Sequence, residues 1–101
     1  MSSYSKEFPD FGALDVALPE GFRDVSWHND ACPSFELKLP SVGYLKLWVD
    51  YVNLDDRELG FDRFTLSLLD QDQEYQSDLL NCEQWADMVA FIADYRAKAA
   101  T

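Results

Sequence analysis

The central part of this chain alternates between hydrophobic and polar residues in several short runs. In the clearest run the hydrophobic positions are Leu45, Leu47, Val49 and Tyr51, with Lys46 and Asp50 among the positions between them. Successive side chains of a β-strand point to opposite faces, so a run of this kind predicts a strand with one buried face. Shorter runs with the same period cover residues 23–28, 35–39 and 64–68. We therefore expect a sheet that buries one side of its strands.

Turn-forming residues separate these runs by short distances. Pro40 and Gly43 stand between the second and third runs, and an acidic stretch at 54–62 precedes the fourth. Short connections join antiparallel neighbours, because parallel neighbours need a long crossover. The segment 70–80 fits two descriptions, since its Asp and Gln content suits a loop while its alternating hydrophobic residues suit a final strand. We predict an antiparallel, meander-like sheet of four to five strands within residues 22–80.

The C-terminal segment changes to a helical period. Its hydrophobic residues recur three or four positions apart, at Trp85, Met88, Val89, Ile92 and Tyr95 or Arg96. Asn81 followed three residues later by Gln84 fits a capping box, in which side chains bond the free N–H groups at a helix start. We predict an amphipathic helix over residues 81–98 that packs on one face of the sheet. The expected fold class is α+β, in two layers.

A chain of 101 residues fits a single domain, residues 1–101. Hydrophobic residues make up 48% and aromatic residues 15% of it, which is enough for a core and argues against intrinsic disorder. Pro9, Gly12 and Pro19 make regular structure improbable at the start, so residues 1–21 are predicted to form an irregular N-terminal arm. The side chains expected to hold this arm on the core are Phe8, Phe11, Leu14 and Leu18.

Acidic residues outnumber basic ones more than twofold, with 19 Asp and Glu against 8 Lys and Arg and a net charge of -11. Contact with phosphate requires Lys and Arg, so this charge argues against direct binding to nucleic acid or to anionic membranes. No segment approaches the ~20 apolar residues of a membrane span, and residues 1–6 lack the apolar part of a secretory signal. We expect a cytoplasmic protein in which Cys32 and Cys82 stay reduced.

Residues that commonly carry catalysis or bind metals fall into no recognised pattern. His28 and Cys32 lie close in sequence but match no nucleophile signature, and adding Cys82 still leaves zinc short of four ligands. The run 70–74 begins like a calcium loop, but an EF-hand needs Gly at the sixth position and an acid at the twelfth. The glycines are too far apart for a phosphate-binding loop. We predict no enzymatic activity, no cofactor and no metal.

The acid excess is concentrated in one region, because residues 50–94 contain 12 acidic residues against two arginines. If residues 70–78 are extended, their acids share one parity and form a negative row along a strand. A second row is expected from the acids of 54–62 with Glu83 and Asp87, provided the fold brings them to the same side. The candidate partner-binding residues are Asp55, Asp56, Glu58, Asp62, Asp70, Asp72, Glu74 and Asp78.

A continuous negative surface would bind clefts lined by Arg and Lys and would compete there with nucleic acid. The leading hypothesis is a small, acidic, non-enzymatic binding protein or inhibitor that occludes a basic, nucleic-acid-binding surface of a partner protein. Proteins of this kind include DNA mimics such as anti-restriction, anti-CRISPR and nuclease-immunity proteins, although no motif of such a family is present here. The oligomeric state stays open.

Two other classes of function compete with this hypothesis. The first is a structural or adaptor subunit that binds through a strand edge or an apolar interface around Tyr44, Trp48 and Tyr51, with the acidity serving solubility only. The second is a small hydrolase, which needs two carboxyl groups facing one pocket with opposed pKa shifts. Binding that weakens steeply with salt would favour the acidic surface over the apolar interface.

Overall fold

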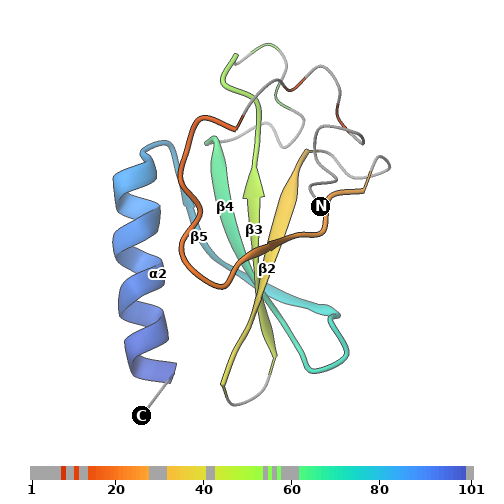
Figure 1. Ribbon diagram of the computed structural model, residues 1–101, viewed down its shortest axis with the longest axis vertical. Coiled ribbons are helices and arrows are strands. Elements are labelled where there is room, and N and C mark those ends of the chain that lie inside the picture. Colours follow the sequence, from red (N-terminus) through yellow and green to blue (C-terminus); the bar gives the residue numbers. More distant parts are fainter. Residues whose placement is uncertain are drawn as a thin grey trace.

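Five strands and one helix make up the described part of the fold (Figure 1). The structure, a computed structural model, describes residues 8, 11, 14–27, 32–40, 43–53, 55, 57 and 62–99. The elements are β1 (Arg23–Asp24), β2 (Ser34–Lys38), β3 (Tyr44–Val49), β4 (Phe64–Leu69), β5 (Tyr75–Cys82) and α2 (Trp85–Ala99). All neighbouring strands are antiparallel and follow the chain order β1-β2-β3-β4-β5. The predicted α+β fold, an antiparallel meander with a C-terminal helix packed on it, is confirmed.

Strand β3 forms the middle of the core. Its Leu45, Leu47 and Val49 are all 0% exposed. In the register of the sheet, Leu47 lies between Phe35 of β2 and Leu66 of β4. Each such row places hydrophobic side chains of three strands side by side on one face, which is the contact that stabilises a sheet. The side chains between them, on the opposite face of β3, are Tyr44, Lys46 and Trp48.

Helix α2 covers the core face of the sheet at strands β4 and β5. Met88 and Ile92 are 0% and 1% exposed, and the Trp85 ring centroid lies 5.0 Å from that of Phe64. Val89, which the sequence places in the same hydrophobic stripe, is 39% exposed and lies at its border. In the described part of the chain, no helix has the length and apolar content needed to cross a membrane.

The N-terminal arm packs against the same core as the helix. Its contributing side chains are Phe11, Leu14, Val16, Leu18 and Phe22. The guanidinium Nη1 of Arg96 donates a 2.6 Å hydrogen bond to the carbonyl of Glu20, which ties the arm to the end of the helix. In Figure 1 the arm passes beside the helix and in front of strands β2 to β4. The helix and the arm therefore close the core together.

The first strand is shorter than the alternation of residues 23–28 predicts. Only Arg23–Asp24 pair as a strand, and the backbone N–H of Val25 makes one further bond to the carbonyl of Ser34. After Val25, the Ser26 side chain takes the place of the backbone hydrogen bonds between the two segments. The hydroxyl of Ser26 accepts a 3.1 Å bond from the N–H of Ser34 and donates a 3.3 Å bond to its carbonyl. His28, the end of the predicted strand, lies outside the described residues.

The helix begins later than the predicted residue 81. Strand β5 continues to Cys82, and Asn81 uses its side chain to donate a 2.7 Å bond to Oγ1 of Thr65 on β4. The carbonyl of Gln84 accepts the bond from the N–H of Met88 at 3.4 Å, so the helical bonds start there. The capping box was a wrong prediction, because an Asn side chain can bond across strands as well as at a helix start.

Candidate functional site

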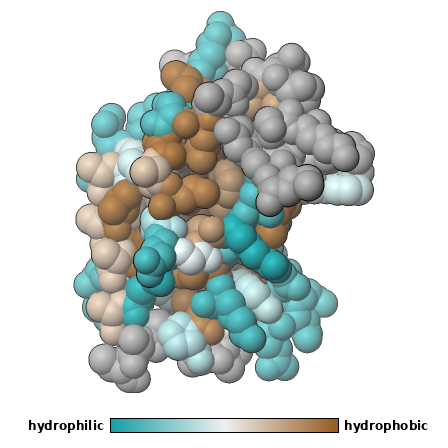
Figure 2. Space-filling model, in the orientation of Figure 1, coloured by the Kyte–Doolittle hydropathy of each residue, from teal (hydrophilic) through white to brown (hydrophobic). Residues whose placement is uncertain are grey.

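The four acids of the 70–78 segment lie on the β4–β5 hairpin. We call these four residues the hairpin patch: Asp70, Asp72, Glu74 and Asp78. Asp70 organises the turn, because its Oδ1 accepts hydrogen bonds from the backbone N–H groups of Asp72 at 2.8 Å and Glu74 at 3.0 Å. Gln73 completes the turn with a φ of 64°. The Asp70 carboxylate thus serves the backbone, while the side chains of Asp72 and Glu74 are exposed. Figure 2 shows hydrophilic surface at the lower right, where Figure 1 places this hairpin.

The hairpin patch is not the straight negative row that an extended 70–78 segment would give. Residues 70–74 form the turn, and β5 starts only at Tyr75. The register between β4 and β5 also shifts twice, between Leu66 and Ser67 and between Leu68 and Leu69. Asp78, on the strand itself, accepts a 2.8 Å bond from the hydroxyl of Ser67. The exposed carboxylates therefore cluster around a hairpin instead of following one strand.

A second group of carboxylates gathers at the start of the helix, and we call Asp62, Glu83 and Asp87 the helix-start patch. All three act on the half-buried thiol of Cys82. Burial raises the pKa of this thiol, and the negative charges of Asp87, Asp62 and Glu83 raise it further. The backbone N–H of Arg63 donates a 3.1 Å bond to Oε1 of Glu83, so Asp62, the residue before Arg63, lies close to the helix start.

The other acids of the 54–62 connection are not part of the helix-start patch. Asp55 is exposed on the connection between β3 and β4. Asp56 and Glu58 lie outside the described residues. Asp62 precedes strand β4 and Asp70 follows it, so the two patches lie at opposite ends of this strand. A strand rises about 3.3 Å per residue, so the six residues of β4 separate the patches by about 20 Å. Of the described candidate residues, Asp62 belongs to one patch, Asp70, Asp72, Glu74 and Asp78 belong to the other, and Asp55 belongs to neither.

Arg57 is buried inside the helix-start patch, with a side chain that is 4% exposed. It binds Glu83 in a bidentate manner, with Nη1 to Oε1 at 2.6 Å and Nη2 to Oε2 at 2.8 Å. Its Nε and Nη2 also donate to the carbonyls of Tyr51 at 2.7 Å and Val52 at 3.1 Å. The hydrogen bond between Arg57 and Glu83 lowers the pKa of Glu83 and raises the pKa of Arg57. One arginine thus fixes the β3–β4 connection to Glu83, two residues before the first residue of the helix.

Arg63 has the matching role toward the N-terminal arm and is 7% exposed. Its Nη1 and Nη2 donate to Oδ2 and Oδ1 of Asp15 at 2.9 Å and 2.5 Å, which lowers the pKa of Asp15. Its Nε donates to the carbonyl of Asp50 at 3.0 Å. Both basic residues of the acidic region are therefore internal, and neither presents its charge to solvent beside the exposed carboxylates. Sequence reasoning counted these arginines but missed that they face inward.

Of the three residues that could form a nucleophile or zinc site, the structure describes Cys32 and Cys82. Cys32 is buried and Cys82 half-buried, and the two do not form a disulfide bond. His28 is outside the described residues, so the predicted lack of a Cys–His pair stays a prediction. Within the described ranges, no three His, Cys, Asp or Glu side chains lie close enough together to hold a metal ion.

Comparisons of this chain with protein-family models, with curated proteins and with solved structures found no match. The fold and the side-chain geometry are therefore the observations that bear on function. They define the class of the protein as a small acidic α+β domain, with carboxylates at two ends of its sheet and two internal arginines at the end next to the helix start.

Proposed function

We propose that the protein is a small, non-enzymatic binding protein that occupies a basic, nucleic-acid-binding surface of a partner protein, as DNA-mimic inhibitors do. The observation that supports this most is the inward placement of Arg57 and Arg63. Their charges are used inside the fold, and among the described residues no ion pair joins the exposed Asp72 or Glu74 to a cation. We expect the protein to act in the cytoplasm.

The division into two patches changes the expected mode of contact. One continuous row would run along a groove, whereas patches about 20 Å apart would contact a basic surface at two points. The hairpin patch projects from the sheet, so it is the better candidate for first contact. Long-range attraction between opposite charges speeds association and weakens as salt screens it. A partner rich in exposed Arg and Lys is the chemistry that such a protein would select.

The test uses the protein as bait in its native host extract, at low salt, with duplex DNA as competitor. The double variant Asp72→Asn with Glu74→Gln neutralises two exposed side chains of the hairpin patch. The matched control, Glu20→Gln with Asp94→Asn, removes the same amount of charge at exposed positions beside or on helix α2. Far-ultraviolet circular dichroism checks that all three proteins are folded.

We expect the wild type and the control to retain a basic protein that elutes with salt and that duplex DNA displaces. The hairpin variant is expected to lose this protein. Equal retention by the hairpin variant, or failure of DNA to displace the partner, would refute the proposed surface.

A structural or adaptor role is the second candidate, favoured by one observation on the sheet edge. β5 is an outer strand, and its Tyr75 is 62% exposed. The aromatic residues that the sequence suggested for this role are less available. Tyr51 packs edge to face on Phe11 at 5.0 Å between ring centroids, and Trp48 lies under the ammonium of Lys46 at 4.4 Å. Partner binding that is indifferent to salt would select this role instead.

A further inference from the structure

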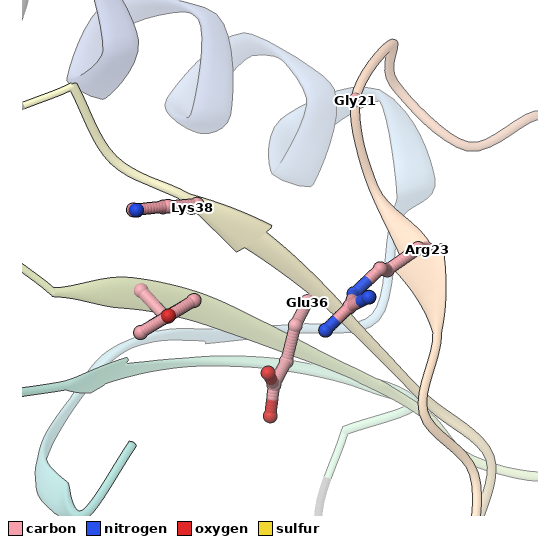
Figure 3. Close-up of a pocket in the computed structure, with 5 residues that line it drawn as sticks. Gly21, Arg23, Glu36 and Lys38 are labelled. Carbon is pink, nitrogen blue, oxygen red and sulfur yellow. The ribbon is translucent and has the colours of Figure 1, made fainter. Parts of the chain in front are cut away.

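A hollow of about 290 Å³ lies on the sheet at strands β1 to β3. It is lined by Gly21, Arg23, Glu36, Lys38 and Tyr44. Arg23 is the register partner of Glu36, and Lys38 is the register partner of Tyr44, so the strands themselves bring these side chains together. Figure 3 shows Arg23, Glu36 and Lys38 around the same space, with the backbone at Gly21 at its rim.

The charges around this hollow differ from those of the rest of the molecule. Arg23 and Lys38 are both exposed, and neither forms an ion pair with any described residue. Lys46 stands beside Glu36 in the sheet register and adds a third cation nearby. In a chain with a net charge of -11, this is a local excess of positive charge. Exposed cations that gather around a concave site are the usual means of binding an oxyanion.

Glu36 places a negatively charged carboxylate in the same hollow as these cations. It is 7% exposed, and its Oε1 accepts a 2.8 Å bond from Nε2 of Gln73. This bond holds the carboxylate in place in the lining of the hollow. Gln73 belongs to the β4–β5 turn, and Glu36 places a negative charge in the lining of the hollow. A ligand with an anionic group alone would be repelled there, whereas one that also carries a cation would not.

We propose that this hollow binds a small phosphate monoester that also carries an ammonium group. Arg23, Lys38 and the Tyr44 hydroxyl offer donors from three side chains, which suits the three terminal oxygens of a phosphate better than the two of a carboxylate. Glu36 accepts from the ammonium group. The volume of about 290 Å³ limits the ligand to a small molecule. This site differs in its chemistry from the acidic surface proposed for the partner, although Gln73 of the hairpin holds its Glu36.

The test is an NMR titration of the ¹⁵N-labelled protein with phosphoethanolamine, near neutral pH. Ethyl phosphate is the matched probe without the ammonium group, and ethanolamine and acetate are the probes without phosphate. We expect saturable shifts at the amides of residues 23, 36, 38 and 44 with phosphoethanolamine, weaker binding of ethyl phosphate, and no saturable shifts with ethanolamine or acetate.

Three variants assign the roles. Arg23→Gln is expected to lower the affinity for both phosphates by about tenfold or more, because it removes a charged donor. Glu36→Gln is expected to reduce phosphoethanolamine binding to the level of ethyl phosphate while leaving ethyl phosphate unchanged or tighter. Lys98→Gln removes a cation on the helix and is expected to change nothing.

Several results would overturn the proposal. These are the absence of saturable shifts with either phosphate, acetate binding as strong as phosphate binding, or an Arg23→Gln variant that binds like the wild type. Equal affinity for the two phosphates in the wild type would remove the assigned role of Glu36. Because Arg23 and Lys38 are exposed, their substitution is compatible with folding, and the amide spectrum of each variant checks this directly.

Discussion

Ser26, which follows β1, and Ser34, which begins β2, differ in how their hydroxyl groups are hydrogen-bonded. Both bonds of the Ser26 hydroxyl go to the backbone of Ser34, at 3.1 Å and 3.3 Å. The hydroxyl of Ser34 itself is buried and has no hydrogen-bond partner among the described residues. A buried polar group without a hydrogen-bond partner lowers stability. Removing one partner of an existing hydrogen bond also lowers stability, because the other partner is left buried and unpaired.

We therefore expect Ser34→Ala to raise the free energy of unfolding by about 1 kcal/mol. Ser26→Ala is the matched control at a similarly buried position, and it is expected to lower that free energy by about 1 to 3 kcal/mol, because it leaves the N–H of Ser34 without a partner. Urea unfolding followed by tryptophan fluorescence measures both. A destabilised Ser34→Ala protein would contradict the assignment of an unpaired hydroxyl.

At the same scale, the sequence could not reveal the roles of the arginines. Arg63 and Asp15 are 48 positions apart, and Arg57 and Glu83 are 26 positions apart. No local pattern links residues at such separations, since the contact exists only once the arm and the connection have folded onto the sheet. The only available signal was that both arginines stand alone in an acidic region, where each has many possible carboxylate partners.

Among the elements, helix α2 offers a direct test of which face is buried. Met88 is 0% exposed and Val89 is 39% exposed, although both fit the helical stripe. We expect Met88→Ala to lower the free energy of unfolding by about 2 to 5 kcal/mol, because it leaves a cavity in the core.

Val89→Ala is the neighbouring control, with an expected loss of less than about 1 kcal/mol, since little buried surface is removed. Chemical denaturation of the two variants gives the comparison. Similar losses for both would show that the helix is rotated relative to the face described here.

The β3–β4 connection and the arm are held by carboxylates whose pKa values are lowered. Glu83 is bonded to Arg57, and Asp15 to Arg63, and in each case the hydrogen bond to the arginine is the main cause. A carboxyl group whose folded pKa lies below its unfolded pKa binds protons more readily in the unfolded chain. Its contribution to stability is therefore complete above the unfolded pKa and is lost as the pH falls through the folded pKa.

We expect the free energy of unfolding to decrease as the pH is lowered from neutral to about pH 3, across the range in which carboxyl groups titrate. Glu83→Gln is expected to make this dependence shallower, because one of the titrating groups is removed. Urea unfolding at a series of pH values measures both. An identical pH dependence for Glu83→Gln would show that the ion pair with Arg57 does not contribute.

The elements differ in how well the sequence predicts them. Strands β2, β3 and β4 follow from the alternation of hydrophobic and mainly polar residues, although the structure buries nearly all positions of β2 and β4 on both faces. The 70–74 turn did not follow, since Asp and Gln suit a loop as well as an exposed strand, and the Asp70 bonds that define the turn are visible only in the structure. The helix start was misplaced for a related reason, because Asn81 bonds across to β4.

At the scale of the whole molecule, the charge distribution depends both on the number of acidic residues and on where the fold places them. The count of 12 acids against two arginines in residues 50–94 follows from the sequence, but their grouping does not. Strand β4 separates the acids before it from those after it, so a chain segment with a single sign of charge becomes two patches. Arg23 and Lys38, which come from a less acidic part of the chain, both line the hollow on the sheet.

The salt dependence of the complex with the captured partner tests the central claim most directly. The association constant is measured at increasing salt concentration for the wild type, for Asp72→Asn with Glu74→Gln, and for Glu20→Gln with Asp94→Asn. We predict a steep decrease with salt for the wild type and the control, and a clearly shallower decrease for the hairpin variant, because fewer screened charges take part in its contact. The same slope for the hairpin variant and the wild type would contradict the claim that the hairpin carboxylates bind the partner.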